Sequence, residues 1–499
     1  MRILYVDVDT LRPDHTSLYG YTRNTTPWLQ TLADDAVLFD HYYASDSPCV
    51  PSRAALTSGQ FGASTGAIGN AGPAAQLPFT GANGRRPHEV LLGGHLYRNG
   101  MYTTSISCFP ERHQAYWFTG NWREWMTPSL SLGDDQPAAG VVDVAVDWLQ
   151  RHGREPNWLL HVHFWDPHTP YVVDPKCAGD AASLGPAPAW PDDAAIAEHA
   201  TFYGPHTALD LYEDGGAWAV PRPTSAYPET MPDAITRRAD FELLCNGYDG
   251  SIRYWDEEFG RLLGTLRSLG VYDDTAIIVS ADHGECLGEH GVYGDHPMAT
   301  ESVHRLPMLV RWPGVTDRKG VNRRCGDLLY NIDLGPTLCE MLGLPTPDIW
   351  QGRSFAYALR GLAAPQRREY LVLSHGAYTY QRAVRTSTHL YIHTQDPGLF
   401  RLAPEQLYLV EEDPHLLTDL SETEPKLVDR CRSLLVEWLS RYAPVMDGLG
   451  DPMQRRLREG PEDAFPVGGY ARRLVETGRA DLAEDLMRRR RHWPTVARR

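Results

Sequence analysis

Short apolar runs alternate with segments of helical periodicity over about the first 360 residues of the chain. Continuous apolar runs of strand length predict buried strands at 3–8, 102–107, 158–164, 275–280 and 306–312. Apolar residues spaced three and four apart predict helices at 25–36, 90–98, 141–152, 240–269 and 334–342. Strands that alternate with helices form a parallel or mixed sheet covered on both faces. The pattern therefore predicts an α/β fold for this part of the chain.

The pattern changes after residue 362. Short strands are predicted close together at 369–374, 383–386 and 390–393, followed by a helix at 424–441 and a charged helical tail at 470–492. We therefore divide the chain into a larger α/β domain at 1–362 and a smaller α+β domain at 363–499. Within the first, residues 172–238 are rich in Pro, Ala, Gly and Asp and weak in periodicity, which indicates a surface insertion that shapes a pocket.

Composition and charge narrow the classes of function. The chain is 42% hydrophobic and 22% charged, which is typical of a globular protein. Its net charge of −17 disfavours nucleic acid and anionic membranes as partners, so an anionic substrate needs a local positive pocket or a metal. No apolar stretch approaches a membrane span, no leader peptide is visible and the eight cysteines form no C-x-x-C pair. We expect a cytoplasmic protein without a thiolate zinc site.

Carboxylates follow two of the predicted strands directly. Asp7 and Asp9 end the first strand, and Asp282-His283 follows the strand at 275–280. Ligand sites of open α/β sheets lie beyond the carboxyl ends of strands, and Asp and His are metal ligands. Gly284 allows a sharp turn with close backbone approach. Either aspartate of the first pair is a candidate ligand, although Asp9 alone is equally well explained as a helix cap or a structural hydrogen bond.

A third cluster is Cys49-Val50-Pro51-Ser52-Arg53. Pro51 suits the first position of a helix, which places Cys49 just before the helix begins. The amides and dipole of a helix N-terminus favour anions, so we expect the thiol of Cys49 to have a lowered pKa and to be reactive. Arg53 suits bidentate binding of an oxyanion. The alternative is a buried structural cysteine.

The segment 49–53 resembles the C-x-P-S-R signature of the formylglycine-dependent sulfatases of the alkaline phosphatase superfamily. Further segments resemble this family in the same order along the chain, at 9–14, 166–171, 282–285, 288–291, 311–314 and 333–337. The resemblance implies an alkaline phosphatase-like fold, in which a large, mostly parallel mixed sheet lies between helices beside a smaller C-terminal α+β domain. It implies a sulfuric ester hydrolase that cleaves an organic sulfate, such as a sulfated carbohydrate.

The resemblance also assigns roles to residues. Cys49 is oxidised to formylglycine by a formylglycine-generating enzyme, and a hydroxyl of its hydrate attacks sulfur. Arg53 holds the modified side chain, and His168 contacts the sulfate or protonates the leaving alcohol. One divalent metal is implied, with Ca²⁺ favoured and Mn²⁺ or Mg²⁺ as alternatives. Its ligands are Asp9, Asp282, His283 and the modified Cys49.

The chain departs from the family pattern at three places. Thr10 stands where many members carry a second aspartate, and Asp7 is a candidate replacement. Two sulfate-binding lysines of the family are missing, which leaves as substrate-binding candidates Arg112, His113 and His296. These departures keep open a phosphonate monoester or phosphodiester hydrolase with the same formylglycine. A non-catalytic anion-binding protein with unmodified Cys49 is a third hypothesis.

Overall fold

The computed structural model describes residues 1–77, 90–128, 136–171, 181–211, 231–443, 450–459 and 466–492. An eight-stranded sheet forms its centre, in the order β13-β2-β12-β8-β1-β7-β5-β6. In that order the strands are β13 (Arg324–Cys325), β2 (Ala36–Phe39), β12 (Met308–Arg311), β8 (Thr275–Ala281), β1 (Arg2–Val8), β7 (Trp158–Phe164), β5 (Tyr102–Ile106) and β6 (Glu124–Met126). Strands β8, β1, β7, β5 and β6 run parallel, whereas β12 is antiparallel to both neighbours.

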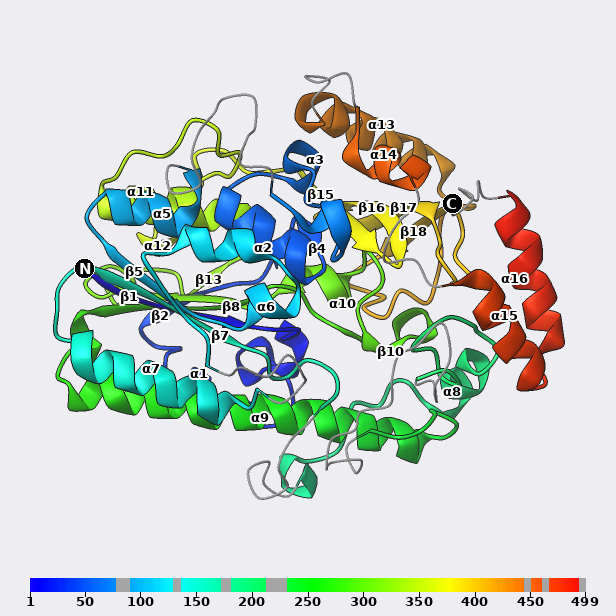
Figure 1. Cartoon of the computed structure of the whole chain (residues 1–499), viewed down its shortest axis with the longest axis horizontal. Coiled ribbons are helices and arrows are strands. Elements are labelled where there is room, and N and C mark those ends of the chain that lie inside the picture. Colours follow the sequence, from blue (N-terminus) through cyan, green and yellow to red (C-terminus); the bar gives the residue numbers. More distant parts are fainter. Residues whose placement is uncertain are drawn as a thin grey trace.

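Helices cover both faces of this sheet, which explains why its central strands are continuous apolar runs. Helices α7 (Ala138–His152) and α9 (Arg238–Ser268) lie together on one face (Figure 1). The opposite face carries α2 (Cys49–Ser58), α5 (Leu92–Arg98), α11 (Leu334–Leu342) and α12 (Ala356–Leu359). The predicted α/β fold with helices on both sides of a mixed sheet is confirmed.

A second sheet, in the order β18-β17-β16-β15-β4, holds most of the C-terminal part of the chain. Its strands are β18 (Glu405–Leu409), β17 (His389–Asp396), β16 (Thr379–Thr386), β15 (Tyr370–Ala377) and β4 (Asp46–Ser47), and α13 (Pro425–Tyr442) packs on it. Strand β4 belongs to the N-terminal part and pairs in parallel with β15, through Ser374 opposite Asp46. The small sheet therefore braces the segment that leads into Cys49, across the predicted domain boundary at 362.

Short elements connect these layers. They are α1 (Pro27–Gln30), β3 (Tyr42–Tyr43), α3 (Gly62–Thr65), α6 (Phe109–Arg112), α8 (Asp193–His199), β9 (Cys286–Leu287), β10 (Tyr293–Asp295), α10 (Glu301–His304), β11 (Arg305–Leu306) and β14 (Leu329–Tyr330). Helix α1 corrects the predicted helix at 25–36, because the chain leaves the helix after one turn and residues 36–38 pair with β12. No described helix is both long and apolar enough to cross a membrane.

The tail corrects a second prediction. Residues 470–492 do not form one helical segment, because α15 (Val467–Glu476) ends before Gly478, whose φ of 78° is left-handed, and α16 (Ala480–His492) then begins. A shorter helix, α14 (Pro452–Glu459), precedes them. Of the predicted insertion at 172–238, residues 172–180 and 212–230 lie outside the described residues.

Candidate active site

The acidic ends of two neighbouring strands meet at one edge of the central sheet. Strands β1 and β8 are parallel neighbours with Asp7 opposite Ser280, so their carboxyl ends finish side by side. Asp9 and Asp282 follow these ends, and donor atoms of Asp9, Cys49, Asp282 and His283 all lie within 4.8 Å of one another. All four side chains are buried. The structure thus assembles the four residues predicted as metal ligands.

Close backbone approach is required where β8 turns into this edge. A Cβ atom on Gly284 would lie 2.1 Å from the carbonyl oxygen of Ser302, which no side chain can accept. The backbone amide of Gly284 donates to Val303 O at 2.7 Å. The glycine therefore lets the chain that carries Asp282 and His283 press against α10, as the sequence predicted.

Cys49 is the first residue of α2, which corrects the predicted helix start at Pro51. Pro48 precedes the helix and Pro51 lies within its first turn. The Sγ atom of Cys49 lies 3.1 Å from His283 Nε2 and 4.0 Å from the side-chain nitrogen of Asn70. Asn70 Oδ1 also accepts a hydrogen bond from Val50 N at 3.0 Å, which ties this loop to the first turn of α2.

The predicted lowered pKa of Cys49 is wrong. Burial raises the pKa of the thiol well above its usual value, and the carboxylates of Asp9 and Asp282 raise it further. The helix N-terminus and Arg53 act in the opposite direction but do not outweigh burial beside two anions. The helix position alone was therefore a poor guide to the acidity of this side chain.

Arg53 joins the three carboxylates of the site. Its Nε atom lies 3.0 Å from Asp7, and its Nη1 atom lies 3.2 Å from Asp9 and 2.5 Å from Asp282. The guanidinium is thus occupied by carboxylates, while its buried Nη2 has no hydrogen-bond partner among the described residues. Asp7 binds Arg53 and His161 and is not among the four clustered ligands, so the structure does not support it as a replacement ligand.

The charge balance of this buried cluster fits a divalent cation. Three carboxylates, Asp7, Asp9 and Asp282, face one guanidinium, Arg53, which leaves two negative charges uncompensated. Buried charges are costly unless they are paired or coordinate a metal. Asp9 Oδ1 is buried without a hydrogen-bond partner in the described chain, and burial raises the pKa of Asp282 to about 7 despite Arg53. Two carboxylates and an imidazole are suitable ligands for Ca²⁺, Mn²⁺ or Mg²⁺.

Two histidines that sequence reasoning missed support the carboxylates from behind. His161 and His163 alternate along β7 and therefore point to the same face of the sheet. Nε2 of His161 lies 3.4 Å from Asp7, and Nε2 of His163 lies 3.5 Å from Asp9. Burial lowers the pKa of both, that of His163 to about 4, so both rings are neutral at pH 7. A His-x-His pair inside an otherwise apolar strand was the available signal.

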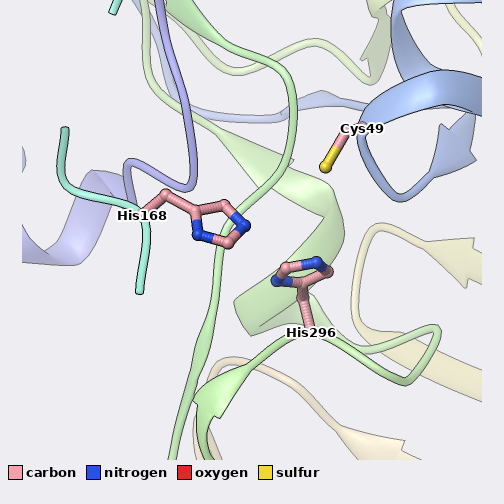
Figure 2. Close-up of side chains that lie close together, drawn as sticks. All are labelled: Cys49, His168 and His296. Atoms are coloured by element: carbon pink, nitrogen blue, oxygen red, sulfur yellow. The ribbon is translucent and has the colours of Figure 1, made fainter. Parts of the chain in front are cut away.

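His168 and His296 complete the site around the nucleophile (Figure 2). Ligand atoms of His168, His296 and Cys49 lie within 4.8 Å of one another, and the three side chains point into one space. The rings of His168 and His296 are 5.5 Å apart, and that of His296 is 4.1 Å from His283. Burial lowers the pKa of His168 to about 4. Its Nδ1 lies 2.5 Å from the carbonyl oxygen of Thr169, which leaves Nε2 free for the site.

The loop that carries His168 is fixed by a buried carboxyl. Glu285 Oε1 lies 2.5 Å from Thr169 Oγ1, and its Oε2 lies 2.8 Å from the hydroxyl of Tyr171. The ring of His168 also stacks on Trp165 at 4.0 Å. Glu285 therefore positions the loop without reaching the reacting atoms, a role that its place after Asp282-His283 did not reveal.

The other predicted substrate-binding residues lie in an adjoining cavity of about 860 Å³. Arg112, at the end of α6, stacks over Trp165 at 3.3 Å. Burial lowers the pKa of His113 to about 3, and its Nε2 is buried without a hydrogen-bond partner among described residues. The three predicted substrate-binding residues therefore lie in two places. Arg112 and His113 line this cavity, whereas His296 lies at the nucleophile. The described part of the predicted insertion lines other cavities and does not contribute to this one.

Comparison with known proteins agrees with this geometry. The family model described as "Sulfatase" matches residues 2–344, and that described as "N-sulphoglucosamine sulphohydrolase, C-terminal" matches residues 288–437. An ulvan-active sulfatase of Formosa agariphila is 25% identical over 88% of this chain and 82% of its own length. A choline-sulfatase of Rhizobium meliloti is 24% identical, with 86% and 84% covered. A phosphonate monoester hydrolase of Silicibacter pomeroyi shares the fold, with a TM-score of 0.67, 19% identity and 88% and 95% covered.

The fold and the family match define the class of this protein. The chain belongs to the sulfatase family, the formylglycine-dependent group within the alkaline phosphatase superfamily. It is a sulfuric ester hydrolase, as the sequence predicted, and the hypothesis of a non-catalytic anion-binding protein is therefore wrong.

Proposed function

We propose that this enzyme cleaves the sulfate ester of a sulfated saccharide, with Cys49 converted to formylglycine as the nucleophile. The observation that carries the proposal is the position of Cys49, inside a C-x-P-S-R segment and among Asp9, Asp282 and His283. Its Sγ atom points into the space shared with His168 and His296, where a tetrahedral ester would bind (Figure 2).

The residues present fit one divalent cation, for which Ca²⁺ is our first choice. Asp9, Asp282, His283 and the modified Cys49 would hold it, and when bound it would supply Lewis-acid stabilisation of the sulfate oxygens. Arg53 holds the ligand carboxylates of Asp9 and Asp282 in place. His168 presents its free Nε2 to the ester, in position to exchange a proton with the leaving oxygen.

A saccharide substrate is supported by the relatives. One is described as acting on ulvan and another as an N-acetylglucosamine-6-O-sulfatase, and a structural neighbour contains D-glucosamine-2-N,6-O-disulfate. The cavity beside Cys49 has the volume of a sugar-binding site and exposes the ring of Tyr116, a side chain suited to stacking on a pyranose. Maturation of Cys49 would require a formylglycine-generating enzyme as a partner, and a cytoplasmic location remains our prediction.

A phosphonate monoester or phosphodiester hydrolase is the second candidate. It is favoured by the shared fold of a phosphonate monoester hydrolase and by the absence of lysine from the described part of the site. The described chain holds just two lysines, Lys319 and Lys426, and neither lines the cavity or contacts the ligand cluster. Comparison of kcat/KM for 4-nitrophenyl sulfate and bis(4-nitrophenyl) phosphate separates the candidates, and a higher value for the diester would overturn our choice.

Substitution of Cys49 tests the nucleophile. Enzyme co-expressed with a formylglycine-generating enzyme should yield a peptide spanning residue 49 in which CHO replaces CH₂SH, as read by mass spectrometry. Cys49→Ala should lower sulfate ester turnover by at least about a thousandfold, since residual catalysis then comes from binding alone. Cys431→Ala, at a buried cysteine of α13, should retain turnover. A fully active enzyme that keeps a free thiol at Cys49 would disprove the assignment.

A further inference from the structure

The cavity beside the nucleophile combines segments from distant parts of the chain. Its described lining comes from the end of α3 and the loop after it, from the segment around α6 and from α14. It includes Asn70, Arg112, His113, Tyr116 and Arg455. Asn70 connects the cavity to the reacting centre, because its side-chain nitrogen lies 4.0 Å from Cys49 Sγ. A sulfate ester held at Cys49 would therefore extend its organic part into this cavity.

The described lining of this cavity is positive, in a strongly acidic protein. The chain carries a net charge of −17. Two guanidinium groups, those of Arg112 and Arg455, line the cavity, and no described lining residue is acidic. Such a pocket attracts anions and repels cations, the more so where water is partly excluded.

Arg455 carries a charge that has no partner among the described residues. Its guanidinium makes no hydrogen bond or ion pair within the described chain. This contrasts with Arg382, which is fully buried and binds the carboxylate of Asp451 with both terminal nitrogens, at 2.5 and 2.6 Å. A half-buried arginine kept free beside a cavity is suited to binding an external anion.

The position of Arg455 is fixed by the helix that carries it. The pair Arg382–Asp451 anchors the start of α14, where Asp451 also accepts a hydrogen bond from Met453 N at 3.1 Å. Met453 is fully buried and packs in one cluster with Ile68 and Ala74. These two residues flank the loop that lines the cavity, so the C-terminal helix and the wall of the cavity form one packed unit.

We propose that this cavity selects organic sulfates that carry a second anionic group, a carboxylate or a second sulfate, and that Arg455 binds this group. The inference rests on the proposed function, because it concerns the organic part of the ester bound at Cys49. It also predicts that a cationic ester such as choline sulfate is a poor substrate. Arg455 is thereby a specificity-determining residue. It lies outside all the segments that resemble the sulfatase family and far from Cys49 in the sequence, so the sequence alone did not indicate this role.

Two matched substrate pairs test the proposal. N-Sulfoglucosamine 6-sulfate is compared with N-acetylglucosamine 6-sulfate, and an unsaturated hexuronate 2-sulfate is compared with its methyl ester. For the wild-type enzyme, kcat/KM should be higher for the doubly anionic member of at least one pair, and the responding pair identifies the second group as sulfate or carboxylate. Equal or higher kcat/KM for the singly anionic member of both pairs, or for choline sulfate, would overturn the proposal.

The variant Arg455→Gln should reduce this preference. Loss of a charge-assisted hydrogen bond predicts a roughly tenfold to hundredfold fall in the ratio of kcat/KM within the responding pair, expressed mainly in KM. Arg458→Gln is the matched control, because Arg458 lies on the exposed side of the same helix and outside the cavity lining. An unchanged ratio in Arg455→Gln would remove Arg455 from substrate recognition.

Binding to a variant without turnover separates this inference from the proposed function. In Cys49→Ala, calorimetric affinity for N-sulfoglucosamine 6-sulfate and for the hexuronate 2-sulfate should again fall when Arg455→Gln is added. If the wild-type enzyme hydrolyses none of these sulfates but this dependence persists, the proposed function fails and the anion site stands. If hydrolysis is observed but both affinities are insensitive to Arg455, the anion site fails and the proposed function stands.

Discussion

Arg53 shows how a single side chain can organise a site of opposite charge. It contacts Asp7 and Asp9 on one strand and Asp282 on the neighbouring one, so three carboxylates share one guanidinium. Removal of one partner from a buried charge network leaves the others uncompensated. The effect of substituting a carboxylate on metal binding should therefore depend on whether that carboxylate is itself a ligand. Asp282 is in the ligand cluster, whereas Asp7 is bound by Arg53 and His161 behind it.

We therefore predict that Asp282→Ala loses bound metal and activity together, whereas Asp7→Asn keeps the metal. Activity of Asp7→Asn should fall roughly tenfold to a hundredfold, as is common when a residue that orients metal ligands is changed. Metal content per chain by inductively coupled plasma mass spectrometry and turnover of 4-nitrophenyl sulfate measure the two effects. Loss of metal in Asp7→Asn to the same extent as in Asp282→Ala would instead make Asp7 a ligand.

At the scale of elements, one buried carboxylate gathers several of the polar contacts that attach the tail helix α15 to the body of the protein. Asp210 is fully buried and accepts hydrogen bonds from Arg479 at 2.7 Å with both oxygens, from Arg473 at 2.9 Å and from Tyr470 at 2.6 Å. Burial opposes ionisation, but Arg479 and its neighbours outweigh it and hold the pKa of Asp210 below its usual value. Asp210 therefore provides an ionised anchor for α15, while apolar packing against Tyr203 and Leu399 and the pair of Arg490 with Asp396 also hold the tail.

Asp210→Asn should loosen the attachment of α15. Amide hydrogen exchange in α15 at pH 7 should become roughly tenfold to a hundredfold faster, because the arginines lose their charged partner. Glu484→Gln, at an exposed position of α16, is the control.

The pH dependence of this attachment follows from the lowered pKa of Asp210. A carboxyl whose folded pKa is depressed stabilises the folded state above its unfolded pKa of about 3.9, and this contribution is lost as pH falls through the folded pKa. In the wild-type protein, the protection of α15 amides against hydrogen exchange should therefore persist from neutral pH down to about pH 4 and decrease below it. Protection in Asp210→Asn equal to that of wild type at pH 7 would contradict the role of Asp210.

At the scale of the whole molecule, the site joins parts of the chain that are far apart in sequence. Cys49 and His283 are in contact, the small C-terminal sheet holds β4 directly before Cys49, and α14 lines the cavity. A cation bound at this junction would connect the ends of β1 and β8 with the start of α2 (Figure 1). Such a ligand stabilises the folded chain as a unit, because the unfolded chain holds no such site.

Addition of Ca²⁺ should therefore raise the melting temperature of metal-free enzyme. At a concentration about 100 times Kd, the gain is about 2.7 kcal/mol, which corresponds to a shift of a few degrees in a protein of this size. Differential scanning fluorimetry with and without chelator measures this shift in melting temperature. The same measurement with Mn²⁺ and with Mg²⁺ shows which of the three cations stabilises the enzyme most. A shift in Asp282→Ala equal to that in wild type would place the stabilising cation elsewhere.

Much of the fold and of the reacting centre was predictable from local pattern. The central strands read as apolar runs because they are buried on both faces, and the predicted strand at 158–164 and helix at 334–342 match the structure residue for residue. The helix at 25–36 is predicted too long, because α1 ends at Gln30 and residues 31–35 form a turn that leads into β2. The pairing of β2 with β12, which brings the chain into the sheet from residue 36, cannot be predicted from the local pattern because the partner strand lies far away in sequence.

The sequence by itself determined which side chains end the strands β1 and β8 and which segment surrounds Cys49, since these follow from residue order and from the rule that parallel strands finish at one edge. Only the tertiary structure decided the acidity of Cys49, the sharing of Arg53 among three carboxylates and the presence of Asn70 and Arg455 in the cavity. The physical reason is that burial and electrostatic interactions depend on distances in space. Those distances are set by contacts between segments that the order of residues does not place together.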